Sequence, residues 1–137
     1  MRVVIDTNVF ISSFFGGKPR KVIDLWKNGE IVLCLSSGIV DEYMAVLQRM
    51  GLEEEKDLGE LLELLARGFH ILFAAKTPRL KVVRADPADD KFIECAVALK
   101  AEVIITGDKS LKEIGNYMGI KILGPQEFLD SLASKPR

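Results

Sequence analysis

The chain has 137 residues, of which 48% are hydrophobic and 28% are charged. This length and balance predict one globular domain over residues 1–132, followed by a loose tail at residues 133–137. The 19 basic and 20 acidic residues leave a net charge of −1, which argues against a large non-specific nucleic-acid footprint. It does not exclude a nuclease with acids in its site and basic residues at the rim.

Short apolar runs, β-branched at residues 3–5 and 103–106, alternate along the chain with segments in which apolar residues recur every three or four positions. The short apolar runs predict strands at residues 2–6, 31–35, 70–73, 103–106 and 121–123. The periodic segments predict helices at residues 7–13, 19–28, 38–50, 53–67, 86–100, 110–117 and 126–132. Residues 76–84 are predicted as a basic connector, extended over 81–83. This alternation predicts an α/β fold, with a parallel sheet of four to five strands covered by helices on both faces.

The cysteine content and the apolar runs predict the compartment. Two cysteines without a CxxC motif and a single histidine argue against a zinc site, and the cysteines are expected to be buried free thiols. The apolar N-terminus is short and contains Asp6, so no signal peptide is predicted. No apolar run reaches the ~18–20 residues that span a bilayer. We therefore expect a cytoplasmic protein without membrane contact.

Two predicted strands end in an acid. Val3-Val4-Ile5 is followed by Asp6, and the apolar run 103–106 is followed by Gly107 and Asp108. In open parallel α/β sheets the carboxyl ends of the strands form one edge, where ligands bind. We therefore expect Asp6 and Asp108 to lie at the same edge.

Two predicted helices bring further acids toward this edge. Glu42 lies at the margin of the apolar face of helix 38–50, whereas Asp41 points away from it. In helix 86–100, Asp89 lies at the centre of the inward face and Asp90 about one residue's rotation from it, while Asp86 has the position of an N-cap. Because an unpaired buried carboxylate is costly, an acid on an apolar face is expected to meet a metal or other acids.

The candidate site is thus Asp6, Glu42, Asp89 or Asp90, and Asp108. No basic residue in the same motifs is an obvious counter-ion, and clustered carboxylates repel one another unless a cation joins them. Oxygen ligands without Cys or His select Mg²⁺ or Mn²⁺. Such ions serve phosphodiester hydrolysis by activating water and stabilising the leaving oxygen.

Four motifs, in this order along the chain, resemble the PIN domain: residues 4–9 (VIDTNV), the helix carrying Glu42, residues 86–92 (DPADDKF) and residues 105–109 (ITGDK). They look most like its small prokaryotic branch of toxin–antitoxin components, related to VapC-type toxins. The resemblance implies a PIN-like three-layer α/β/α sandwich and a Mg²⁺- or Mn²⁺-dependent ribonuclease. It also implies RNA as substrate, an antitoxin protein as partner and a homodimer.

Carried onto this chain, the resemblance implies the catalytic acids Asp6, Glu42, Asp89 and Asp108, and the metal ligands Asp6, Asp89, Asp90 and Asp108. The third acid stays open. The spacing to Thr106 seen in VapC-type chains favours Asp90. The prokaryotic branch that the motifs resemble most favours Asp89, and so does the position of Asp89 at the centre of the inward helix face. Asn8 and Thr106 are expected to orient the carboxylates.

Basic residues near the expected edge are candidates for RNA phosphate contacts. The first group is Lys18, Arg20 and Lys21 after the Gly16-Gly17 loop, and the second is Lys76, Arg79, Lys81 and Arg84. Lys109 and Lys112, beside Asp108, are further candidates.

Two alternative functions stay open. A haloacid-dehalogenase-type phosphatase also has an Asp after its first strand, but it needs a second acid two residues later, where this chain has Asn8. A catalytically inactive PIN-like module that binds RNA or protein would carry the same acids without turnover.

Overall fold

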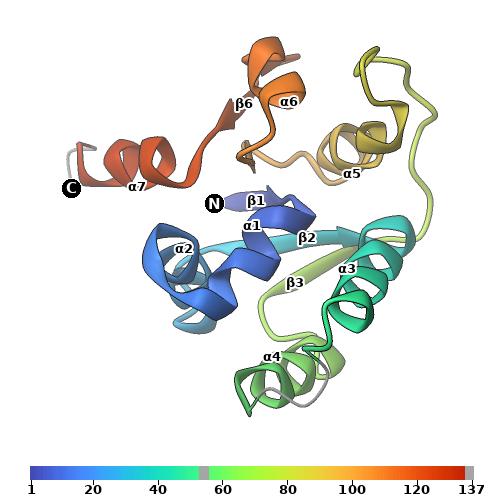
Figure 1. Ribbon diagram of the computed structural model, residues 1–137. Helices are drawn as coiled ribbons and strands as arrows, with labels where there is room; N and C mark the ends of the chain where they lie inside the picture. The colour runs from blue at the N-terminus through green and yellow to red at the C-terminus, as the bar shows by residue number, and fades with distance from the viewer. Residues whose placement is uncertain (53–55, 135–137) are drawn as a thin grey trace.

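The computed structural model describes residues 1–52 and 56–134, in which six strands form one sheet in the order β3-β2-β1-β4-β6-β5 (Figure 1). The strands are β1 (Arg2–Ile5), β2 (Val32–Ser36), β3 (Ile71–Ala74), β4 (Val103–Ile105), β5 (Asn116–Tyr117) and β6 (Ile120–Leu123). All neighbours pair in parallel except β5, which is antiparallel to β6. The α/β class and the mostly parallel sheet are confirmed.

Helices cover both faces of this sheet. They are α1 (Thr7–Ser12), α2 (Gly17–Lys27), α3 (Ser37–Arg49), α4 (Lys56–Ala66), α5 (Asp90–Leu99), α6 (Lys109–Ile114) and α7 (Pro125–Ala133), with 3-10 turns η1 (Ser13–Phe15) and η2 (Pro87–Asp89). Helix α5 packs across β1 to β4, whereas α1 and α2 lie on the other side of β1 (Figure 1). None of these described helices has the length and apolar character needed to cross a membrane.

Strand β1 lies at the point where the strand order reverses. Its Val3 pairs with Leu33 of β2 on one side and with Val103 of β4 on the other. The connection after β1 leads to β2, and the chain returns to β4 only after β3 and α5. At such a point the carboxyl ends of two adjacent strands open onto a crevice, and Asp6 and Asp108 follow these two strands.

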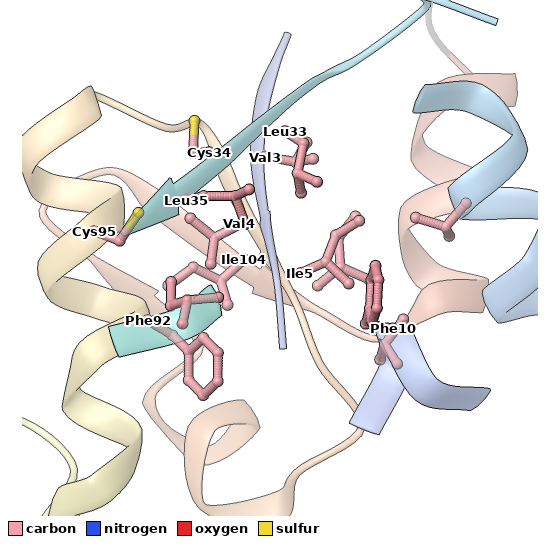
Figure 2. Close-up of a cluster of buried hydrophobic side chains, with 14 of the residues drawn as sticks. Val3, Val4, Ile5, Phe10, Leu33, Cys34, Leu35, Phe92, Cys95 and Ile104 are labelled. Atoms are coloured by element: carbon pink, nitrogen blue, oxygen red, sulfur yellow. The ribbon is translucent and has the colours of Figure 1, made fainter. Parts of the chain in front are cut away.

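The core explains why the strands are continuous apolar runs. Val3, Val4 and Ile5 are fully buried, and Figure 2 shows side chains from α5 on one side of β1 and Phe10 of α1 on the other. A parallel strand covered on both faces has no solvent-facing positions to fill with polar residues.

Both cysteines lie in this core as free thiols, as expected. Burial raises the pKa of Cys34 to about 11 and that of Cys95 to about 12.

The sheet has six strands, so the predicted four to five is wrong. The helix predicted at 110–117 ends at Ile114, because Gly115 leaves it with a positive φ of 70°. The next residues form β5, which turns into β6 through Met118 and Gly119, at φ 51° and 87°. Two positive φ values identify a type I′ hairpin turn. Because Met is unusual at such a position, the sequence carried no clear turn signal.

The remaining boundaries differ by a few residues. Residues 81–83 form no strand, and the helix predicted from residue 86 begins with the η2 turn. The helix predicted at 53–67 is described only from Lys56, because residues 53–55 lie outside the described part of the chain. The expected tail at 133–137 begins inside α7, which includes Ala133, and its residues 135–137 also lie outside the described part.

Candidate metal centre

Asp6 is the N-cap of α1 and is fixed through both carboxylate oxygens. Its Oδ1 accepts a hydrogen bond of 2.9 Å from the backbone N–H of Val9, and its Oδ2 accepts one from the hydroxyl of Thr106. Only 3% of the residue is exposed. Burial raises the pKa of Asp6, the two hydrogen bonds oppose this, and the charges of Asp108 and Glu42 add to it. Asp6 therefore lies close enough to Asp108 and Glu42 for their charges to act on it.

Thr106 joins the ends of β1 and β4. Its hydroxyl donates to Asp6 and accepts a hydrogen bond of 2.9 Å from the backbone N–H of Asp108. Asp108 in turn caps α6, since its Oδ1 accepts from Ser110 N–H at 2.7 Å. These contacts suit the orienting role expected for Thr106. Asn8 is exposed on α1, and in the described part of the chain no hydrogen bond joins it to a carboxylate.

Three carboxylates converge between η2 and α6. One oxygen from each of Asp86, Asp89 and Asp108 lies within 4.8 Å of the others; we call these three residues the acidic cluster. Among the described residues, the buried Oδ2 of Asp89 has no hydrogen-bond partner. Burial, followed by the charges of Asp86 and Asp108, raises the pKa of Asp89 to about 7. The cluster thus holds an unsatisfied oxygen in a strongly negative environment.

The structure separates the two neighbours that the sequence left open. Asp90 is buried, and its Oδ1 accepts hydrogen bonds from the backbone N–H groups of Val82 at 3.0 Å and Val83 at 2.8 Å. Its side chain therefore fastens the basic connector to α5, while Asp89 joins the acidic cluster. The geometry favours Asp89 as the third acid.

Sequence analysis missed Asp86 as a member of the acidic cluster, because its position as an N-cap was a sufficient explanation. It does cap η2, with its Oδ1 accepting from Ala88 N–H at 3.2 Å. The same turn places the carboxylate beside Asp89 and Asp108. One signal was available: a cap at the carboxyl edge of a sheet lies next to every strand-end acid.

Glu42 is held by two donors. Its Oε1 pairs with the ammonium of Lys91 at 2.6 Å, and its Oε2 accepts from the hydroxyl of Thr7. The expectation that these motifs contain no counter-ion is therefore wrong. Lys91 lies on α5, which packs against α3, and this packing could not be read from either helix alone. Asp41, as expected, is exposed.

Two of the basic residues expected to contact RNA are engaged within the protein. The Arg20 guanidinium donates to the backbone carbonyls of Ser13 and Phe14, each at 2.9 Å, and so closes the end of η1. Lys112 pairs with Glu127 at 3.1 Å, and this contact lowers the pKa of Glu127. Lys18 and Lys109 are exposed.

The acidic cluster fits a small divalent cation. Two oxygens on opposite sides of a Mg²⁺ ion lie about 4.2 Å apart, because each is about 2.1 Å from the ion. The 4.8 Å spread of the cluster is close to this value. All donors are carboxylates, which Mg²⁺ and Mn²⁺ prefer, and a cation would satisfy the free oxygen of Asp89.

Two sequence comparisons relate this chain to known proteins. Residues 2–110 match the PIN domain family, a stretch that includes Asp6, Glu42 and the acidic cluster. MJ1680, an uncharacterized protein from Methanocaldococcus jannaschii, is 34% identical to the chain over 144 residues. The alignment covers 95% of this chain and 90% of that protein.

Proposed function

Since the chain belongs to the PIN domain family, whose members are generally nucleases, we propose that it is a Mg²⁺- or Mn²⁺-dependent endoribonuclease hydrolysing RNA phosphodiester bonds. The observation that carries this proposal is the acidic cluster beside Asp6, with its unsatisfied buried oxygen. Carboxylates this close repel one another unless a cation or a proton is shared among them. The switch-point crevice above β1 and β4 is where an α/β sheet binds its ligand.

The chain's own groups have distinct roles in this proposal. Asp86, Asp89 and Asp108 would hold the cation, which when bound polarises a phosphodiester and lowers the pKa of water. Thr106 and the N–H of Val9 keep Asp6 oriented beside the cluster. Lys91 pairs with Glu42 and so partly offsets the negative charge that this acid adds to the edge.

Asp6→Asn tests the proposal. The amide keeps the size of the side chain but removes its charge, so the variant is expected to stay folded and to lose RNA cleavage by at least about a hundredfold. Cleavage of an end-labelled single-stranded RNA is measured with Mg²⁺, Mn²⁺ or EDTA, and circular dichroism checks folding. Asp41→Asn, an exposed acid outside the site, is the matched control and is expected to cleave normally.

The outcomes separate the alternatives. Full activity in Asp6→Asn would overturn the site assignment. A wild-type protein that binds Mn²⁺ and RNA without cleaving RNA would support the inactive module. Hydrolysis of para-nitrophenyl phosphate without RNA cleavage would support the phosphatase.

We extend the proposal to a toxin of a toxin–antitoxin pair that acts in the cytoplasm as a homodimer. Its support is the resemblance of the motifs to the VapC-type branch, together with an apolar cavity of about 500 Å³ between α3, α4 and β3. Phe73, at the rim of this cavity, is 54% exposed, which suits a protein interface.

Expression should arrest growth, and Asp6→Asn should abolish the arrest. Co-expression of the protein encoded by the neighbouring gene should relieve the growth arrest. Light scattering of the purified protein measures the oligomeric state, and a monomer would overturn the dimer.

A further inference from the structure

The connector between β3 and η2 joins two points at the carboxyl edge of the sheet. Strand β3 ends at Ala74 on this edge, and α5, which follows η2, runs back toward the start of β4. Both ends of the connector therefore lie on the edge that carries the acidic cluster. Figure 1 shows it as the yellow-green coil between β3 and α5. It begins at the outer strand of the sheet and ends at Asp86.

Two carboxylates of α5 fix this segment although it forms no strand. Glu94 accepts a hydrogen bond of 2.8 Å from the backbone N–H of Leu80, and Asp90 accepts from those of Val82 and Val83. Val83 is 3% exposed, and Leu80 packs against the core. The backbone is thus held at three points, with its apolar side chains turned inward.

The outward side of the connector is basic. Lys76, Arg79, Lys81 and Arg84, which we call the basic strip, are all exposed. No acidic residue lies between positions 75 and 85. In the described part of the chain, no ion pair or side-chain hydrogen bond engages any of the four, because the nearby Asp90 and Glu94 accept from backbone N–H groups instead.

The charge of the basic strip contrasts with the balance of charge over the whole chain. Four uncompensated cations lie within nine residues of a chain whose net charge is −1. The last of them, Arg84, is two residues before Asp86 of the acidic cluster. An RNA that approaches several carboxylates is repelled by them, so adjacent cations that neutralise its phosphates favour its approach to the cluster.

We propose that the basic strip binds the phosphate backbone of single-stranded RNA and leads it to the acidic cluster. This inference rests on the proposed nuclease function, because it makes the RNA bound there the substrate. The side chains of the basic strip form a line rather than a broad patch. At about 3.5 Å per residue the strip spans at most about 28 Å, and a flexible single strand can follow such a line.

The test measures RNA binding in EDTA, where cleavage is excluded. Fluorescence anisotropy of a labelled single-stranded RNA is recorded with wild type and with K76Q/R79Q/K81Q/R84Q. The matched control, R49Q/K56Q/K100Q/K121Q, removes the same charge from four exposed positions on other elements. Thermal unfolding checks that each variant is folded, and K81E alone provides a second, milder perturbation.

The strip variant is expected to bind at least about tenfold more weakly than wild type, and the control within about threefold. The slope of log K against log salt should become shallower by up to about 3 in the strip variant, since each phosphate contact on a single strand contributes about 0.7. The inference would be overturned if both variants bound RNA equally weakly, or if the strip variant bound as tightly as wild type. It would also be overturned if duplex RNA bound as tightly as the single strand.

Two further results separate this inference from the proposed function. If wild type cleaves RNA and the strip variant binds and cleaves equally well, the strip has no role while the nuclease assignment stands. If wild type cleaves no RNA with any divalent ion but binds it through the strip, the strip is confirmed as a binding surface and the nuclease assignment fails.

Discussion

Asp89 and Asp90 are adjacent in the chain, yet the fold gives them different partners. Asp90 accepts two backbone hydrogen bonds, whereas Asp89 faces Asp86 and Asp108 with one oxygen unsatisfied. Helical periodicity favoured Asp89 as the inward acid, whereas the spacing to Thr106 favoured Asp90, so the sequence left the choice open. The initial 3-10 turn also rotates successive side chains by a different angle than an α-helix does.

The raised pKa of Asp89 predicts a pH dependence of stability in the metal-free protein. Below about pH 4 the carboxyl is protonated in both the folded and unfolded states. Between about pH 4 and pH 7 only the folded state keeps the proton, so the free energy of unfolding falls as pH rises through this window. Asp89→Asn removes this titration and should be more stable than wild type at pH 7.5, but about equal near pH 4.

Urea unfolding in EDTA at the two pH values measures this difference. Asp6 also has a raised pKa, but it is present in both proteins, so the comparison isolates Asp89. Asp41→Asn serves as the control. The same stability difference at both pH values would contradict the assignment.

The pair Lys91–Glu42 predicts a coupling between α3 and α5. Lys91→Met leaves the Glu42 carboxylate without its counter-ion, which should lower the free energy of unfolding by about 1–2 kcal/mol. The value is smaller than for a fully buried pair, because the side chains are 24% and 30% exposed. Glu42→Gln in the same protein should recover most of the loss. Urea unfolding of the four proteins of this cycle measures the coupling, and strictly additive effects would show that there is none.

At the scale of elements, the β5–β6 hairpin predicts a stabilising substitution. Met118 has a φ of 51°, a conformation that Asn adopts more readily than Met, and Asn-Gly is the preferred type I′ pair. Met118→Asn should therefore raise stability by about 0.5–1 kcal/mol. Gly119→Ala, at φ 87°, should lower it by about 1 kcal/mol. Thermal unfolding measures both, and equal signs would contradict the turn assignment.

The elements that the sequence predicted well are those with a two-sided apolar environment. The runs at β1, β2 and β4 are short, apolar and buried, so their sequence pattern reflects burial on both faces of the sheet. Strand β5 was missed because it has two residues and a Met in its turn. The ends of β1 and β4 were predicted to share an edge, which brought Asp6 and Asp108 into one site. Lys91 was missed because its contact depends on how two helices pack.

For the whole molecule, cation binding predicts a shift in thermal stability. A ligand that binds only the folded state at a hundred times its Kd adds about 2.7 kcal/mol, which for a chain of this size is about 8 °C in Tm. Scanning calorimetry with Mn²⁺ and with EDTA measures this shift. Asp89→Asn should show less than half of it. A wild-type Tm that does not respond to Mn²⁺ would contradict a cation site in the acidic cluster.

The central place of β1 also fixes when the site can form during synthesis. Asp6 is synthesised 100 residues before its partner Thr106, which at about 5–20 residues per second is some 5–20 seconds. Until β4 and Asp108 have left the ribosome, β1 lacks one neighbour and the acidic cluster lacks one carboxylate. The site of the proposed ribonuclease is therefore incomplete while the ribosome is still adding these residues.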